Sequence, residues 1–159
     1  MKPGELIAHP VTMAALALWA VNDHLLKPLG GELVGKLSDV ACLVVVPLIV
    51  PAAVELWQSR GGRPWTPASR TLWASAAFAA ATMIAINTHP GAAWLYERGM
   101  GIAQWPLRWA AAILRGEGGV ALLPVDLTED PTDAWTAPAA LVPLWLGRRR
   151  GTATWRPTA

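Results

Sequence analysis

Four apolar runs constrain the fold of this chain more than any other feature. They cover residues 6–26, 40–57, 71–86 and 134–146. About 20 helical residues cross a hydrocarbon core of about 30 Å, and the first three runs come close to that length. The sequence therefore predicts an all-α integral membrane bundle of four transmembrane helices, with a short interfacial helix near residues 105–115 between the third and fourth.

The composition supports a membrane protein with one domain over residues 1–159. Hydrophobic residues make up 53% of the chain and charged residues 15%, against about 25% charged in an average soluble protein. The net charge is only +2, and the basic residues are scattered, so we expect the lipid bilayer as a partner and no nucleic acid. The single cysteine, Cys42, lies inside an apolar run and has no partner for an internal disulfide.

The first and last apolar runs each leave an alternative open. The first could be a cleaved signal peptide, but its leading segment has little positive charge and its Ala-x-Ala triplet lies inside the run, which favours a retained helix. The last run has about 13 residues, including Pro138 and Pro143, which is short for a full crossing. Without it the chain would have three spans, and its C-terminus would lie on the opposite side.

The arginines predict the orientation of the four-span bundle. One group lies in the loop between the second and third runs, and the other follows the fourth run: Arg60, Arg63 and Arg70, then Arg148, Arg149, Arg150 and Arg156. With four spans both groups fall on the same side as Lys2, which the positive-inside rule makes cytoplasmic. Both termini are therefore expected in the cytoplasm, and the tryptophans near the span ends fit an aromatic belt.

The candidate helix at residues 105–115 has two interpretations. Trp105, Trp109 and Ile113 recur at helical spacing, while Arg108 and Arg115 share another face, and Pro106 is acceptable in a first turn. This pattern is typical of a helix that lies in the membrane interface. A helix that caps the bundle would show the same pattern.

Polar residues cluster at the span ends on the side opposite the arginines. Nine of them form the predicted ligand site, which comprises Asn22, Asp23, Lys27, Lys36, Ser38, Asp39, His89, Asp130 and Asp133. Ionisable groups at membrane depth are unfavourable and are a default indication of function. The simpler alternative is that Asp39 and Asp133 cap helix N-termini and the others form local ion pairs. Glu55, at the far end of the second run, is interpreted as an interfacial carboxylate.

Three short motifs among these residues resemble a known family. Asn22-Asp23-x-x-Leu26-Lys27, Gly35-Lys36-Leu37-Ser38-Asp39 and Asp130-Pro131-Thr132-Asp133 are similar to motifs of small bacterial multi-pass membrane proteins with no established activity. The resemblance covers most of the chain, and Gly-Lys-Leu-Ser-Asp is its most specific part. It implies a multi-pass protein of the bacterial cytoplasmic (inner) membrane and supplies neither a reaction nor a cofactor.

Two functions remain open at this stage. The polar cluster could bind a cation or a polar head group at the extracytoplasmic mouth, with carboxylate oxygens as ligands and catalysis as an added possibility. The chain could instead be a structural or accessory subunit that packs against other membrane protein subunits; transport is a weaker third option. No zinc signature, P-loop or nucleophile elbow is present, so no catalytic residue, metal ligand or cofactor is assigned.

Overall fold

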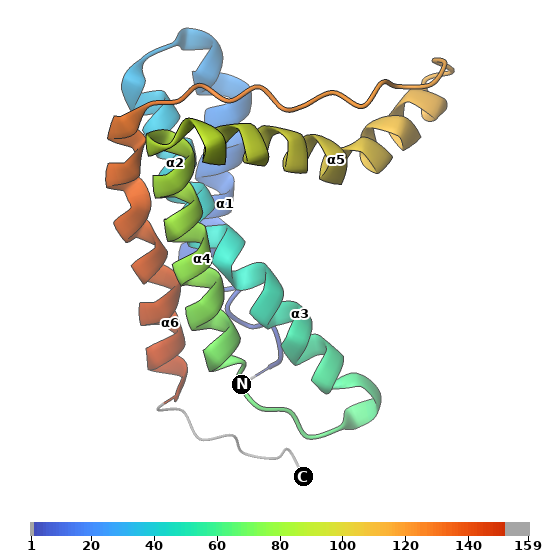
Figure 1. Cartoon of the computed structure of the whole chain (residues 1–159). Coiled ribbons are helices and arrows are strands. Elements are labelled where there is room, and N and C mark those ends of the chain that lie inside the picture. Colours follow the sequence, from blue (N-terminus) through green and yellow to red (C-terminus); the bar gives the residue numbers. More distant parts are fainter. Residues whose placement is uncertain (1, 152–159) are drawn as a thin grey trace. The chain divides into compact units, whose positions relative to one another are not determined.

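The computed structural model describes residues 2–151 and is all-α, with no strand in that range (Figure 1). Its helical elements are α1 (Pro10–Val21), η1 (Asn22–Leu26), η2 (Lys27–Leu29), α2 (Glu32–Val45), η3 (Val46–Leu48), α3 (Ile49–Gln58), η4 (Arg60–Gly62), α4 (Ser69–Thr88), α5 (Pro90–Leu114), η5 (Pro131–Ala140) and α6 (Leu141–Gly151). Arg156, used above for the orientation, lies outside the described residues. The prediction of an all-α protein is confirmed.

The chain divides into two compact units. The first comprises Met1–Met83 and Trp135–Ala159, and the second comprises Ile84–Ala134. Each unit is described by itself below.

Two helices are long and apolar enough to cross a membrane, counted over residues 2–151. They are the nearly continuous helix Leu33–Gln58 and α4, Ser69–Thr88, which match the expected second and third spans. Their length and composition meet the requirement for a span, and buried core helices of soluble proteins can meet it too. The runs at 6–26 and 134–146 are each divided among shorter helical elements.

The second apolar run starts earlier as a helix than its apolarity predicts. α2 begins at Glu32, so Lys36, Ser38 and Asp39 lie within its first turns and not before them. The apolar run begins at residue 40, where the helix becomes suited to lipid. The backbone hydrogen bonds of the helix begin earlier, at Glu32. Pro47 lies in the 3-10 element η3, where the α-helical ladder is interrupted as expected for proline.

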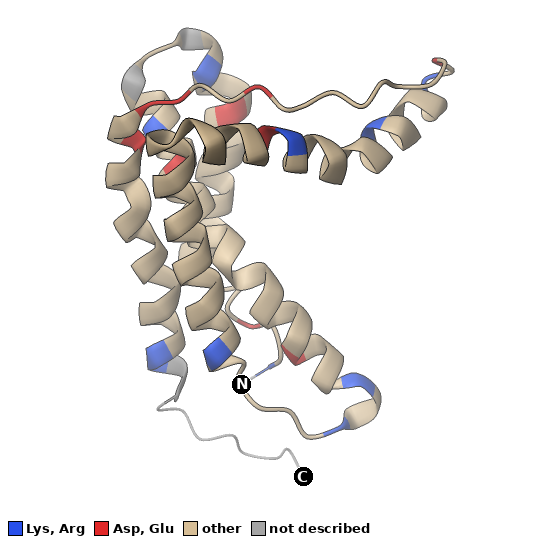
Figure 2. Ribbon diagram, in the orientation of Figure 1, with Lys and Arg blue, Asp and Glu red and all other residues tan. Residues whose placement is uncertain are grey.

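The core of the first unit is formed by the segment before α1 together with α2, η3, α4, η5 and α6. Its buried residues are Leu6, Leu43, Leu48, Leu72, Ala76, Ala140, Leu144 and Leu146. A Cβ added at Gly147 would overlap the side chain of Leu72, so α6 approaches α4 closely at a glycine. Charged residues are absent from the middle of α6 and of α4 within this unit, and Figure 2 shows these stretches in tan.

The second unit is built on α5 and a return segment, residues 117–130. The return segment runs back along α5, and Val125 N–H donates to the Glu97 carbonyl (3.0 Å). A Cβ at Gly101 would overlap the Leu123 carbonyl oxygen, so only glycine permits this approach.

The helix expected at residues 105–115 is therefore the second half of a longer helix. α5 begins at Pro90, and Pro106 lies in its interior, so the placement of Pro106 in a first turn was wrong. Gly99, Gly101 and Pro106 lower helix propensity and suggested a later start. His89 caps the true N-terminus, because its Nδ1 accepts from Gly91 N–H (3.1 Å) and Pro90 supplies the favoured first helical residue.

Candidate polar site

A buried hydrogen-bond network joins the end of α1 to the start of α2. Asn22 opens the π-helical element η1 and is 0% exposed. Its Nδ2 donates to Ser38 Oγ (2.6 Å) and to the Val34 carbonyl (2.7 Å) of α2. Ser38 Oγ in turn donates to Asp23 Oδ1 (2.6 Å). We name Asn22, Asp23, Lys27 and Ser38 the Asn22 cluster.

Two glycines allow this meeting of residues about 16 positions apart. Gly30 and Gly31 have φ angles of 76° and 113°, which only glycine adopts readily. The chain reverses there, and the first turns of α2 return alongside η1. π-Helical turns often mark functional sites, because the extra residue in the turn changes the direction of neighbouring side chains.

The orientation of the Asn22 carboxamide is fixed by its partners. The Val34 carbonyl can only accept a hydrogen bond, so the Asn22 nitrogen must face it. The carboxamide oxygen Oδ1 then points to the other side, where it is buried and has no hydrogen-bond partner. Leaving a buried acceptor unpaired is unfavourable by about 1–3 kcal/mol, and native structures rarely do so without a reason.

Asp23, linked to the buried Asn22 amide nitrogen through Ser38 Oγ, reaches toward the surface. Lys27 Nζ lies 3.1 Å from Asp23 Oδ1, one helical turn away, and the Asp23 side chain is 34% exposed. The Trp19 indole, one turn in the other direction, is a further hydrogen-bond partner of Asp23. The cluster therefore runs from an exposed ammonium group to a fully buried carboxamide.

Lys36 and Asp39 lie beside the cluster on α2. Both are half-buried, and their spacing of three residues places them on one face of the helix. α2 begins at Glu32 with Gly31 in the N-cap position, so Asp39 is seven residues inside the helix. The alternative role of Asp39 as an N-cap is therefore wrong.

The predicted site residues of the second unit have local roles. His89 caps α5, and the Asp130 carboxylate Oδ1 accepts from Thr132 N–H (2.8 Å) and Thr132 Oγ (2.7 Å) at the start of η5. Asp133 lies inside η5, where its N–H donates to the Asp130 carbonyl (2.9 Å), so Asp130 and not Asp133 is the capping residue. Asn87 Oδ1 accepts from Asp130 N–H (3.2 Å).

The structure thus brings together only part of the predicted ligand site. Asn22, Asp23, Lys27 and Ser38 are in direct contact, and Lys36 and Asp39 flank them on α2. His89, Asp130 and Asp133 belong to the other unit. A single mouth formed by all nine residues stays a prediction.

Glu55 is a buried residue that the sequence pattern led us to misinterpret. It is 3% exposed, and its two carboxylate oxygens accept from Gly4 N–H (2.8 Å) and Ala68 N–H (3.1 Å). The expected interfacial carboxylate is therefore a cross-link between three distant segments. The pocket beside it has a volume of about 20 Å³, enough for about one water molecule, which favours a structural role.

The chemistry of the Asn22 cluster is that of a small polar site. No group of three or more His, Cys, Asp or Glu side chains that could hold a metal ion occurs within residues 2–151. What the cluster offers is one neutral oxygen in need of a donor, one carboxylate, and one ammonium group. A ligand with a positive or hydrogen-bond-donating group fits the first two.

No protein-family model, curated protein or solved structure matches the chain. The resemblance of the three motifs to small multi-pass membrane proteins therefore stays a prediction.

Proposed function

We propose that the chain is a four-span protein of the bacterial inner membrane whose Asn22 cluster binds a cation or a polar head group bearing an ammonium group. In this topology both termini are cytoplasmic, and the cluster lies at the extracytoplasmic end of the first two spans. His89, Asp130 and Asp133 fall on the same side of the membrane.

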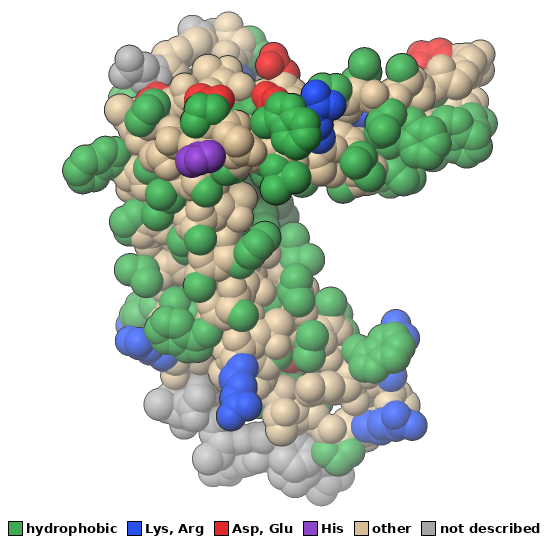
Figure 3. Space-filling model, viewed as in Figure 1, with side chains coloured by type: hydrophobic (Ala, Val, Ile, Leu, Met, Phe, Trp, Pro, Cys, Tyr) green, Lys and Arg blue, Asp and Glu red, His purple; other side chains and the backbone are tan. Residues whose placement is uncertain are grey.

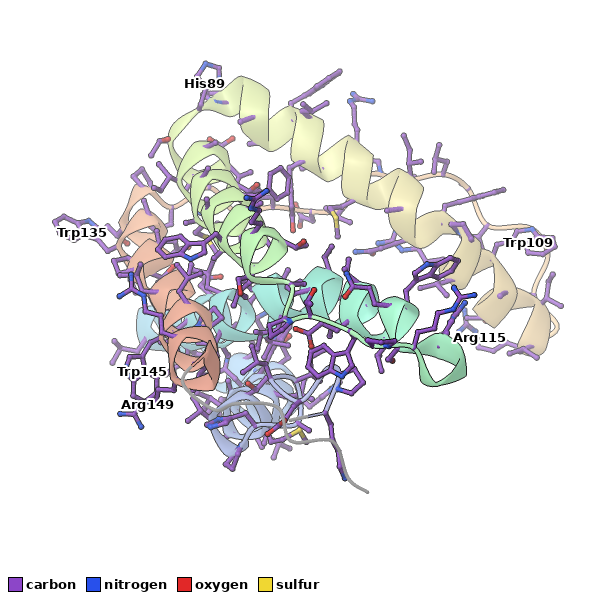
Figure 4. All side chains as sticks on the ribbon, turned by 90° about the horizontal axis from the view of Figure 1, so that it is seen from below. His89, Trp109, Arg115, Trp135, Trp145 and Arg149 are labelled. Atoms are coloured by element: carbon purple, nitrogen blue, oxygen red, sulfur yellow. The ribbon has the colours of Figure 1, made fainter. Side chains whose placement is uncertain are left out.

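Arginine and tryptophan pairs support the membrane location. Three guanidinium groups stack on tryptophan rings at helix ends on the side that the topology makes cytoplasmic: Arg60 on Trp57 (4.6 Å), Arg148 on Trp73 (5.5 Å) and Arg149 on Trp145 (4.0 Å), with the last pair labelled in Figure 4. Tryptophan is enriched at membrane interfaces, and arginine at helix ends extends toward the head groups. Both preferences are met by these pairs.

The unpaired Asn22 Oδ1 is the observation that carries the ligand proposal. The Asn22 nitrogen donates two hydrogen bonds within the protein, which hold the side chain in place. The carboxamide oxygen is buried without a partner and is therefore the atom that a ligand would contact. A sodium ion, a magnesium ion or the ammonium group of ethanolamine would satisfy this oxygen, and the Asp23 carboxylate, which is linked to the Asn22 amide through Ser38 Oγ, supplies negative charge in the same cluster. Lys27 and Lys36 could then bind the phosphate of a head group.

Ligand-dependent thermal stability tests the proposal. The full chain in detergent is heated while tryptophan fluorescence is recorded, with sodium chloride, magnesium chloride or glycerophosphoethanolamine as the probe and N-methylglucamine chloride as the ionic-strength control. A ligand that binds only the folded state raises the unfolding temperature in proportion to ln(1 + [L]/Kd). We expect one probe to raise it by a few degrees, and the probe that does so separates an inorganic cation from a head group.

Asn22→Leu should abolish that shift, because leucine keeps the branched shape and removes the acceptor. Thr12→Val is a matched control, since Thr12 is a buried polar residue of α1, the helix that leads into η1, and its Oγ donates to the Leu6 carbonyl (2.7 Å). The control should retain the shift. An equal shift in Asn22→Leu, or no shift in the native chain with any probe, would contradict the proposal.

The exposure of α4 favours a second candidate, an accessory subunit of a larger membrane complex. Only 22% of its apolar window is buried within the chain, and Phe78 is 75% exposed. A bulky change on this surface, Ala77→Phe, would then disrupt an assembly without changing the probe-dependent shift. Co-purification of partner subunits with the native chain but not with Ala77→Phe would favour this candidate.

A further inference from the structure

One face of α5 is covered by the return segment and the opposite face is bare. On the covered face, Trp105 Nε1 donates to the Val120 carbonyl (2.9 Å), and Arg108 Nη1 donates to the Leu123 carbonyl (3.5 Å) of the return segment. Gly101 lies against Leu123, as described above. The second unit therefore buries this side of the helix with its own chain.

The bare face of α5 carries large apolar side chains from its first turns to its last. Its large side chains are 45% to 88% exposed and comprise Leu95, Ile102, Leu107, Trp109, Ile113 and Leu114. Leu95, Ile102 and Trp109 follow one another at intervals of seven residues, which places them on one stripe, and Figure 3 shows hydrophobic side chains along much of α5. Hydrophobic surface of this extent marks an interaction site.

Of the charges of α5, Arg98 lies at the border of this face, three residues after Leu95 and four before Ile102, and the other two lie away from it. The helix has three charged residues, Glu97, Arg98 and Arg108. Glu97 and Arg108 are eleven residues apart, which is close to three full turns, and they share the side of the return segment. Arg98 stacks on Trp94 with a distance of 4.5 Å from its guanidinium carbon to the ring centroid. Arginine and tryptophan beside an apolar stripe are typical of a helix that lies in a lipid interface.

The connection to α4 indicates which surface the bare face meets. α4 is a candidate membrane span that ends at Thr88, and α5 begins at Pro90, with only His89 between them. If α4 crosses the bilayer, the first turn of α5 starts at the bilayer surface. In Figure 4, His89 is labelled at this junction, and Trp109 and Arg115 are labelled further along the helix.

From these observations we propose that the bare face of α5 docks on the lipid interface of the extracytoplasmic leaflet, over most of the length of the helix. The occupant is lipid, with the acyl chains below the head groups in contact with Leu95, Ile102 and Ile113. The return segment faces water. This inference rests on the proposed membrane location but is independent of the ligand of the Asn22 cluster.

Spin-label accessibility in lipid nanodiscs tests the inference. The full chain, with Cys42→Ser as background, carries one nitroxide at Ile102, Ile113, Gly118 or Phe78, in nanodiscs of phosphatidylcholine and phosphatidylglycerol. Oxygen partitions into lipid, and a nickel chelate stays in water. At Ile102 and Ile113 we expect collisions with oxygen to exceed those with nickel several-fold, at a depth just below the head groups. At Gly118 we expect the reverse.

Phe78 on α4 separates failure of this inference from failure of the membrane location. If Phe78 is oxygen-accessible while Ile102 and Ile113 are nickel-accessible, the α5 face lies in water and the inference is overturned. Low accessibility to both reagents at Ile102 and Ile113 would mean that protein covers the face, which also overturns it. If the nitroxides at Ile102 and Ile113 lie at the bilayer centre, α5 crosses the membrane and the inference is likewise overturned. Nickel access at Phe78 would instead contradict the membrane location.

Discussion

The two asparagines of the chain, one in each unit, use their carboxamides in opposite ways. Asn22 and Asn87 are both nearly inaccessible, at 0% and 4% exposed. Asn87 Oδ1 accepts from the backbone of Asp130, which ties α4 to the start of η5 within the second unit. Asn22 instead donates to Val34 and Ser38, and its oxygen has no partner.

This difference separates a structural asparagine from a candidate functional one. A side chain that only stabilises the fold has its acceptor paired, because a buried unpaired acceptor is unfavourable. Proteins accept such defects chiefly at functional sites, where a ligand completes the pairing. The side chains of His89 and Asp130 also accept from backbone groups two residues away, whereas the side-chain bonds of Asn22 and Ser38 join segments about 15 residues apart.

Both carboxylate oxygens of the buried Glu55 have hydrogen-bond donors, and loss of this side chain should have the largest effect on stability. Glu55→Ala leaves the Gly4 and Ala68 amides without their acceptor, and we expect the free energy of unfolding to fall by about 3 kcal/mol. Denaturant unfolding in detergent measures this change. Glu129→Ala, at an exposed position, is the control and should change stability little. Equal effects of the two substitutions would contradict the cross-linking role.

Asn87→Leu should have the next largest effect. The substitution removes the acceptor of Asp130 N–H and leaves that partly buried donor unpaired, so we expect a loss of about 2 kcal/mol by the same unfolding measurement. Hydrogen exchange at Asp130 should also become faster. If exchange there is unchanged, the Asn87 bond does not hold the start of η5.

Asn22→Leu should be milder, with a loss of about 1 kcal/mol in the absence of ligand. The Val34 carbonyl and Ser38 Oγ lose the Asn22 donor, but Ser38 keeps its bond to Asp23, and the substitution also removes the unpaired oxygen, which offsets part of the loss. A larger loss of stability in Asn22→Leu than in Asn87→Leu would contradict the assignment of the structural role to Asn87. That result would mean that the main role of Asn22 is to stabilise the fold.

The smallest effect should follow from loss of the α5 cap. His89→Ala removes the acceptor of Gly91 N–H, and loss of an N-cap lowers stability by about 0.5–1 kcal/mol. Because the change is local, it should also raise hydrogen exchange in the first turn of α5 only. His24→Ala, at an exposed position in the first unit, is the control and should leave exchange in α5 unchanged.

The apolar helices could be predicted from the sequence because their signal is local. The runs at 40–57 and 71–86 fall within the helices Leu33–Gln58 and Ser69–Thr88. The start of α5 was also within reach, since His89-Pro90 repeats the His9-Pro10 pair at the start of α1, and both histidines cap their helices through Nδ1. Proline at the first helical position was the usable signal.

The partners of the polar groups could not be predicted in the same way, because they depend on tertiary contacts. Glu55 finds its donors 51 and 13 residues away, and the sequence around it is that of a span end. Lys36-Leu37-Ser38-Asp39 was expected to precede a helix, but α2 already includes it, which brings Ser38 to Asn22. Asn22 and Ser38, from two of the predicted motifs, are in direct contact, and a site that includes all nine residues stays a prediction.

The two asparagines also provide the most direct test of the ligand proposal. Protein labelled with ¹³C and ¹⁵N only in asparagine has two side-chain carboxamides, those of Asn22 and Asn87, which Asn87→Leu assigns. Magnetic resonance spectra in lipid nanodiscs are recorded with and without sodium, magnesium or glycerophosphoethanolamine. The proposal predicts that one probe shifts the Asn22 carbonyl signal and leaves Asn87 unchanged. An Asn22 signal that no probe moves, or equal shifts at both residues, would contradict it.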